Sequence, residues 1–199
     1  AKGADLLSLT ELPVALEPGD GDIGIWTGAL VQDGADARIF YTTVAEPDLD
    51  LGGIRVATPT DSDWITWEKG PVVVVAPEGL GVTDYRDPVV RRDPDAWRMF
   101  VGASLNCETA VVLSYTSQDL DAWDYEGIVM QRSTTETDPI WTGAMWECPQ
   151  VFTEGDRAAM VTSVWERIVA HHAAYAVGTY EPGRFDAEHW ARLGYGDSL

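Results

Sequence analysis

The sequence repeats one short segment three times, as Trp26-Thr27-Gly28-Ala29-Leu30-Val31, Tyr85-Arg86-Asp87-Pro88-Val89-Val90 and Trp146-Glu147-Cys148-Pro149-Gln150-Val151. Laid on one another, the segments place Ala29, Pro88 and Pro149 at equivalent positions, 59 and 61 residues apart. Each segment is short and carries β-branched or aromatic residues, which is typical of a β-strand. A period of about 50–65 residues indicates a β-propeller, whose four-stranded blades bury their faces only against neighbouring blades.

Further candidate strands surround these segments, and together they form three groups of four. The twelve strands are bounded by turn residues such as Asp33-Gly34 and Pro182-Gly183. They are expected at 26–31, 38–43, 54–58, 64–69, 85–91, 97–103, 110–116, 123–129, 146–152, 158–164, 172–179 and 189–193. The most helix-like stretch, 168–176, is interrupted by two histidines and ends in strand-like residues, so we predict an all-β chain.

The predicted fold is a β-propeller of four-stranded antiparallel blades, with blade repeats at about 24–70, 84–130 and 145–194. A tryptophan closes each group, and Trp67, Trp123 and Trp190 are expected in the core. A β-sandwich with coincidental spacing is the alternative fold. Because closed propellers have about four to eight blades, residues 1–199 are expected to form a single partial propeller domain. Residues 6–12 and 195–199 are then cut parts of flanking blades, and the missing blades come from the same or another chain.

Composition excludes several classes of function. The chain has 199 residues and carries 13 Lys and Arg against 33 Asp and Glu, a formal charge of −20. This charge repels phosphate backbones and anionic membrane surfaces, so neither nucleic acid nor a membrane is an expected partner. The longest apolar stretch, 71–77, is too short to span a bilayer. The cysteines, Cys107 and Cys148, are expected to be unpaired, which favours the cytoplasm over a secreted location without deciding it.

Two carboxylates lie within one position of each other in consecutive repeats. The innermost strand of each blade lines the central channel, so side chains at its start can converge on one ligand. Asp87 and Glu147 lie at these positions. Most glycosidases use a pair of carboxylates, one as the proton donor and one as the ionised partner. Trp146 and Cys148 flank Glu147, and their burial is expected to favour its neutral, proton-donating form.

These motifs resemble glycoside hydrolase family 32, the invertases, inulinases and levanases. The resemblance rests on Tyr85 to Pro88 and Trp146 to Pro149, with further landmarks in family order at 12–16, 26–29, 67–69 and 195–197. It implies a five-bladed propeller, about three blades of which lie in this chain, and hydrolysis of β-fructosides with retention. It also implies that Glu147 is the acid/base, that Asp87 stabilises the transition state through fructose hydroxyls, and that Arg86 binds substrate beside it.

The sequence departs from the family pattern at several points. The family nucleophile is an aspartate in a Trp-Met-Asn-Asp-Pro-Asn-Gly type motif, and these 199 residues contain no such motif. Thr27 and Ala29 replace serines that are common in the second-blade motif, and Gln150 replaces a frequent aspartate. The nucleophile is therefore expected outside this sequence.

The remaining candidate residues are expected to bind substrate, not a metal. Trp26, Thr27, Trp146 and Cys148 are candidates for sugar contact, together with Arg86; each tryptophan could also belong to the core. His171 and His172 point to opposite faces of a strand, and no Cys or His partner has ligand spacing. The acidic clusters 48–50 and 119–121 lack the glycine of a calcium loop and are interpreted as solvated turns. Neither a metal nor a cofactor is expected.

The sequence thus predicts a glycosidase acting on sucrose or fructans by a retaining two-carboxylate mechanism. One alternative is a non-catalytic carbohydrate-binding propeller or an inactive fragment. Another is an arabinan- or xylan-directed enzyme, although the Glu147-Cys148-Pro149 motif favours the fructosidases. Hydrolysis and fructosyl transfer use the same residues, and the sequence does not choose between them.

Overall fold

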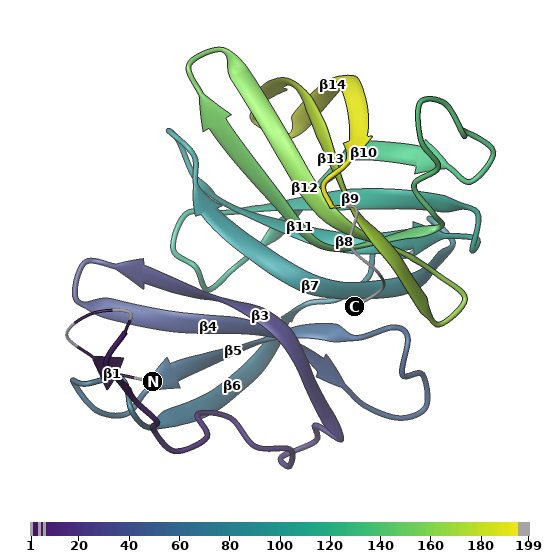
Figure 1. Cartoon of the computed structure of the whole chain (residues 1–199). Coiled ribbons are helices and arrows are strands. Elements are labelled where there is room, and N and C mark those ends of the chain that lie inside the picture. The colour runs from purple at the N-terminus through teal and green to yellow at the C-terminus, as the bar shows by residue number, and fades with distance from the viewer. Residues whose placement is uncertain (1, 4, 6, 195–199) are drawn as a thin grey trace.

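The computed structural model describes residues 2, 3, 5 and 7–194, and these residues form strands, turns and loops with no helix. A small two-stranded sheet pairs β1 (Lys2–Gly3) with β2 (Leu9–Thr10). Three four-stranded antiparallel sheets follow along the chain (Figure 1). Their strands are β3 (Gly24–Asp33), β4 (Asp36–Val44), β5 (Gly53–Pro59) and β6 (Trp67–Val74); β7 (Val82–Arg92), β8 (Trp97–Leu105), β9 (Thr109–Ser117) and β10 (Asp124–Ser133); and β11 (Met145–Glu154), β12 (Arg157–Glu166), β13 (Val169–Glu181) and β14 (Arg184–Arg192).

All twelve predicted strands are confirmed as β3 to β14, although most boundaries differ by one to five residues. The largest differences are the end of the fourth strand, expected at 69 and found at Val74, and the start of the last strand, expected at 189 and found at Arg184. The fourth strand was expected from Trp64 and begins at Trp67, because the Asp61 carboxylate accepts three backbone N–H groups and shapes the loop before it. Trp64 adopts a φ of 56° in that loop. Of the two flanking segments, 6–12 contains β2, which pairs only with β1 among the described residues, and 195–199 lies outside the described residues.

Each sheet is a meander in which the first strand pairs with the second, the second with the third and the third with the fourth. The first strands β3, β7 and β11 lie side by side, with β7 in contact with both others (Figure 1). A parallel bridge from Leu51 to Tyr85 also ties the loop between β4 and β5 to β7. The three sheets therefore present their first strands to one another, as propeller blades do.

Two apolar clusters fill the spaces between the sheets. Met99 and Val101 of β8 pack in the cluster shared with the first sheet, and Phe100 packs in the cluster shared with the third. This alternation follows the two-residue period of a strand and buries both faces of the middle sheet. The prediction that Trp123 and Trp190 lie in the core is confirmed, since Trp123 packs against the first cluster and Trp190 lies in the second.

The prediction that Trp67 lies in the core is wrong. It is half-buried and belongs to neither cluster, and its Nε1 donates to the carbonyl oxygen of Trp64 at 3.0 Å. In the described part of the chain no helix has the length and apolar character needed to cross a membrane.

Gly102 on β8 allows the second and third sheets to approach closely. A Cβ at this position would lie 1.9 Å from the carbonyl oxygen of Trp146 on β11, which is backbone and cannot turn aside. We expect Gly102→Ala to lower the free energy of unfolding by about 2–4 kcal/mol, because β11 must shift to relieve the overlap. Denaturant unfolding of the native protein measures the change. Gly194→Ala is the matched control, since a Cβ there meets nothing within 4 Å, and equal stability of the two variants would contradict the prediction.

Candidate active site

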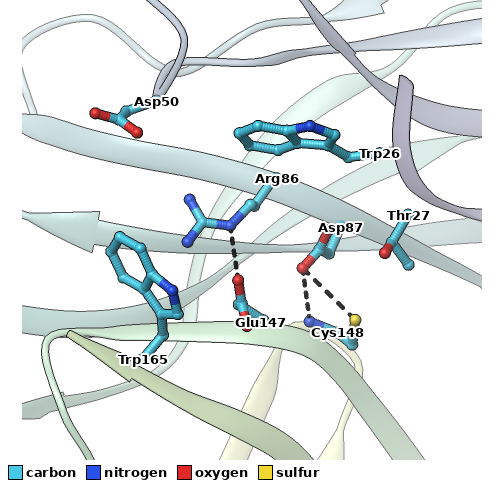
Figure 2. Close-up of a pocket in the computed structure, with 8 residues that line it drawn as sticks. All are labelled: Trp26, Thr27, Asp50, Arg86, Asp87, Glu147, Cys148 and Trp165. Atoms are coloured by element: carbon cyan, nitrogen blue, oxygen red, sulfur yellow. Dashed lines mark hydrogen bonds and ion pairs between the residues drawn. The ribbon is translucent and has the colours of Figure 1, made fainter. Parts of the chain in front are cut away.

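A cavity of about 290 Å³ opens where the first strands of the three sheets meet (Figure 2). Its walls come from β3, β7, β11, β12 and the loop between β4 and β5. It is lined by Trp26, Thr27, Asp50, Arg86, Asp87, Glu147, Cys148 and Trp165. Six of these eight residues were predicted from the sequence as catalytic or substrate-binding residues.

The same β-bulge recurs at the cavity in all three sheets. The pairing of each first strand with its neighbour shifts between Ile25 and Gly28, between Arg86 and Val89, and between Glu147 and Gln150. Positions 28, 89 and 150 are each separated by 61 residues, so the structural repeat is regular. This corrects the sequence alignment in the first segment: Thr27, not Ala29, is equivalent to Pro88 and Pro149. Bulges bend a strand and re-aim its side chains, which is how these residues come to face the cavity.

A threonine opposite the bulge braces it in two of the sheets. The hydroxyl of Thr42 on β4 donates to the carbonyl oxygen of Thr27 at 3.2 Å, and that of Thr162 on β12 donates to the carbonyl oxygen of Glu147 at 2.8 Å. The Thr42 hydroxyl also accepts the backbone N–H of Asp87 at 2.8 Å. Side-chain hydroxyls therefore replace the strand-to-strand hydrogen bonds that the bulges lose.

Asp87 lies deep in the site, with 4% of its surface exposed and a φ of 64° in the bulge. Its Oδ2 accepts the backbone N–H of Cys148 at 3.2 Å and faces the Cys148 thiol at 3.5 Å (Figure 2). Burial raises the pKa of Asp87, and the neighbouring Glu147 carboxylate raises it further, while Arg86 and the Cys148 donors oppose the rise. Asp87 is thus a buried carboxylate that two hydrogen-bond donors of Cys148 hold in one orientation.

Cys148 serves Asp87 as a hydrogen-bond donor. Burial and the adjacent Asp87 carboxylate raise the pKa of the Cys148 thiol to about 12, so the sulfur keeps its proton at neutral pH. Neither Cys148 nor Cys107 forms a disulfide. A protonated thiol is a poor nucleophile, and the role that the geometry gives Cys148 is to orient Asp87.

Arg86 is enclosed on both faces by tryptophan rings. Its guanidinium carbon lies 4.5 Å from the ring centre of Trp165 and 5.7 Å from that of Trp26 (Figure 2). Its Nε donates to Oε1 of Glu147 at 3.1 Å, and its Nη1 forms an ion pair with Oδ1 of Asp84 at 3.4 Å. Arg86 therefore links two carboxylates, one of which lines the cavity.

Glu147 reaches the cavity from β11 with its side chain 23% exposed, so a bound molecule can contact it. The prediction that Trp146 binds sugar is wrong. The Trp146 indole is fully buried, donates from Nε1 to the carbonyl oxygen of Thr142 at 2.9 Å and packs against Trp190. Neighbouring residues on a strand point to opposite faces, so Trp146 faces the core where Glu147 faces the cavity.

Two lining residues were missed by the sequence interpretation. Trp165 is the next-to-last residue of β12, and its pairing with Met145 at the start of β11 brings it to the same edge as Glu147. Asp50 was interpreted as part of a solvated turn; it is exposed, but its loop is tied to β7 by the Tyr85 N–H, which donates to the Asp50 carbonyl oxygen at 3.0 Å. The hairpin pairing of the predicted strands was the available signal for Trp165, and none pointed to Asp50.

Comparison with known proteins agrees with this geometry. The model of the glycosyl hydrolases family 32 N-terminal domain matches residues 1–199. The chain is 32% identical to the sucrose-6-phosphate hydrolase of Escherichia coli over 171 residues, which cover 82% of the chain and 34% of that protein. It is 27% identical to an acid β-fructofuranosidase of Vigna radiata, with 92% of the chain and 30% of that protein covered.

The structural likeness extends over most of the chain. The family 32 β-fructofuranosidase of Bombyx mori superposes with a TM-score of 0.77 and 26% identity, covering 93% of this chain and 40% of that one. The chain thus spans about a third of the length of the two curated relatives named above. From the family match and the shared fold, the chain belongs to glycosyl hydrolase family 32 and corresponds to that family's N-terminal domain.

Proposed function

We propose that the protein containing this chain hydrolyses β-fructosides, namely sucrose or short fructans, with retention of configuration. The observation that carries the proposal is the convergence of Asp87, Arg86 and Glu147 in one cavity from neighbouring first strands. One carboxylate is buried and held by two donors, and the other is accessible to a ligand. Two carboxylates in such different surroundings suit the two roles of a glycosidase site.

In the proposed mechanism, Glu147 gives its proton to the oxygen that leaves the fructosyl anomeric carbon. The ring gains oxocarbenium character as that bond breaks, and the ionised Asp87 stabilises the developing positive charge and binds fructose hydroxyls. A carboxylate outside these 199 residues attacks the anomeric carbon and forms the fructosyl-enzyme. Glu147, now ionised, takes a proton from water, whose oxygen displaces the carboxylate and releases fructose.

The other lining residues suit a sugar ligand. Trp26 is 40% exposed and presents aromatic surface on which a sugar can stack. Thr27 and Asp50 add hydrogen-bonding groups to the wall, and Trp165 adds a second aromatic side chain. Trp26, Thr27, Arg86 and Cys148 are therefore proposed as substrate-contacting residues, with Trp165 and Asp50 added to the set.

The names of the relatives support this substrate class. The Escherichia coli relative is named for sucrose 6-phosphate, the Vigna radiata relative for β-fructofuranosides, and a variant of the Bombyx mori enzyme is solved with sucrose bound. Sucrose or its phosphate is thus named for two of these three proteins. We propose residues 1–199 as part of a propeller whose remaining blades, and the nucleophile, are supplied by the same or another chain.

The proposed function is tested by incubating the native protein with sucrose, 1-kestose and inulin and measuring free fructose. Release of fructose from at least one of them is expected. Binding of sucrose without any release, measured by calorimetry, would favour a non-catalytic carbohydrate-binding propeller and overturn the proposal. Release of pentoses from arabinan or xylan, with no turnover of fructosides, would overturn it in favour of a different glycosidase.

A further inference from the structure

Asp84 is a buried carboxylate that the proposed mechanism does not use. It lies on β7 two residues before Arg86, so both side chains stand on the same face of the strand. Asp84 is 9% exposed and is not among the residues that line the cavity. Its Oδ1 pairs with Nη1 of Arg86 at 3.4 Å, and its Oδ2 accepts the Thr83 hydroxyl at 3.3 Å.

The guanidinium of Arg86 is held from four directions. Trp26 and Trp165 cover its two faces, and Asp84 and Glu147 take hydrogen bonds from its edge. The charge of Arg86 is therefore shared between a carboxylate that lines the cavity and one that does not.

From this arrangement we propose that Asp84 is a positioning residue, which acts on the proton donor Glu147 through Arg86. The inference rests on the proposed function. Asp84 aligns the guanidinium so that Nε points at Glu147, and its negative charge offsets the pull of Arg86 on the Glu147 carboxylate. The charge of Asp84 thereby limits the stabilisation that Arg86 gives to the ionised form of Glu147, the proposed acid.

Other titratable groups lie near Asp84, Arg86 and Glu147. Asp50, from the loop between β4 and β5, acts on Asp84 by charge repulsion, and Arg86 acts on it by attraction. Burial raises the pKa of Asp84, and Asp50 adds to the rise while Arg86 opposes it. Asp87 on β7 and the Cys148 thiol on β11 face Glu147 from the other side.

The test is the pH profile of the Asp84→Asn variant of the native protein with sucrose. Asparagine keeps the shape and an acceptor oxygen but removes the charge, so Arg86 acts more strongly on ionised Glu147. Because Glu147 must begin the reaction protonated, kcat/KM falls as pH rises through its titration. We expect this alkaline limb to move down by about half a pH unit to one unit, with kcat lowered roughly tenfold at the optimum.

Three variants complete the experiment. Asp36→Asn removes the same charge from an exposed site at the far end of the β3–β4 hairpin, and is expected to leave the profile unchanged. Asp84→Glu restores the charge and is expected to recover most of the shift. If Asp84 acts through Arg86, the effects of Asp84→Asn and Arg86→Lys will also be less than additive when combined.

The outcomes separate this inference from the function on which it rests. A wild-type protein that releases no fructose overturns both. An active wild type whose alkaline limb is unmoved, or moved upward, by Asp84→Asn overturns only the role of Asp84. If Asp84→Asn does not fold, as judged by thermal unfolding, Asp84→Ser removes the same charge with a smaller side chain, and its profile decides: an alkaline limb moved to lower pH supports the proposal, and an unmoved limb contradicts it.

Discussion

Replacing Glu147 with Gln is expected to lower kcat for sucrose by about a thousandfold while leaving the fold intact, because an amide has no proton of suitable acidity to give the leaving oxygen. Glutamine matches the shape of glutamate and can still accept the hydrogen bond from Nε of Arg86. The bulge is held through the backbone oxygen of Glu147, which Thr162 contacts, so the substitution does not disturb it.

Comparing two substrates with different leaving groups distinguishes loss of acid catalysis from a distorted active site. Fluoride leaves without needing a proton, so kcat/KM for β-fructosyl fluoride, which reports formation of the fructosyl-enzyme, is expected to fall far less than kcat/KM for sucrose in the Glu147→Gln variant. Thermal unfolding checks that the variant is folded, and Asp36→Asn supplies a control with a removed carboxylate outside the cavity. Equal losses for both substrates in a folded variant, or full activity on sucrose, would remove Glu147 from the acid/base role.

The three-sheet architecture could be predicted because its signal is local. Each strand has its own run of β-branched and aromatic residues and its own turn residues, and the pattern repeats along the chain. That Asp87 and Glu147 line one cavity could be predicted for the same reason, because they lie in the same repeated segment; in the 61-residue repeat, however, Arg86 is equivalent to Glu147 and Asp87 to Cys148. The internal repeat that places them together can be seen in the sequence.

The bulges were harder to predict from the sequence, because the register of a strand depends on the strand with which it pairs. Pro88 and Pro149 lie in two of the bulges, but Thr27 occupies the third, so the first repeat lacks the proline that marks the others. Aligning Ala29 with the prolines therefore displaced that segment by two residues. Trp165 and Asp50 enter the cavity through pairing across a hairpin and through a loop tied to β7, and single-strand patterns do not record such contacts.

The error at Trp146 has a simple cause. Trp146 was predicted to contact the sugar because it lies next to the candidate catalytic Glu147. Adjacent side chains on a strand point to opposite faces, so only one of the two can face the cavity. The residues that flank the cavity are instead Trp26 and Trp165, which enclose Arg86. The arginine that the motif places next to Asp87 thus acquires its surroundings from two other strands.

Asp87→Asn is expected to lower kcat/KM for sucrose by about 10²–10⁴-fold, because it removes the negative charge that faces the developing oxocarbenium ion. Asparagine can still accept the donors of Cys148, so the bulge and the fold should remain. Most of the loss should fall on kcat, since this interaction strengthens as the charge develops. The measurement is steady-state kinetics with sucrose and with β-fructosyl fluoride. Both substrates should suffer, in contrast to Glu147→Gln, and a variant impaired only in KM would contradict the assignment.

The pH profile provides a second reading of Asp87, because the residue must be ionised to act. Burial and Glu147 raise the pKa of Asp87, so its protonation is expected to limit kcat/KM on the acidic side of the profile. Cys148→Ala removes a donor to Asp87 and should move the limb to higher pH. An acidic limb that Cys148→Ala does not move would belong to another group and would contradict the role of Asp87.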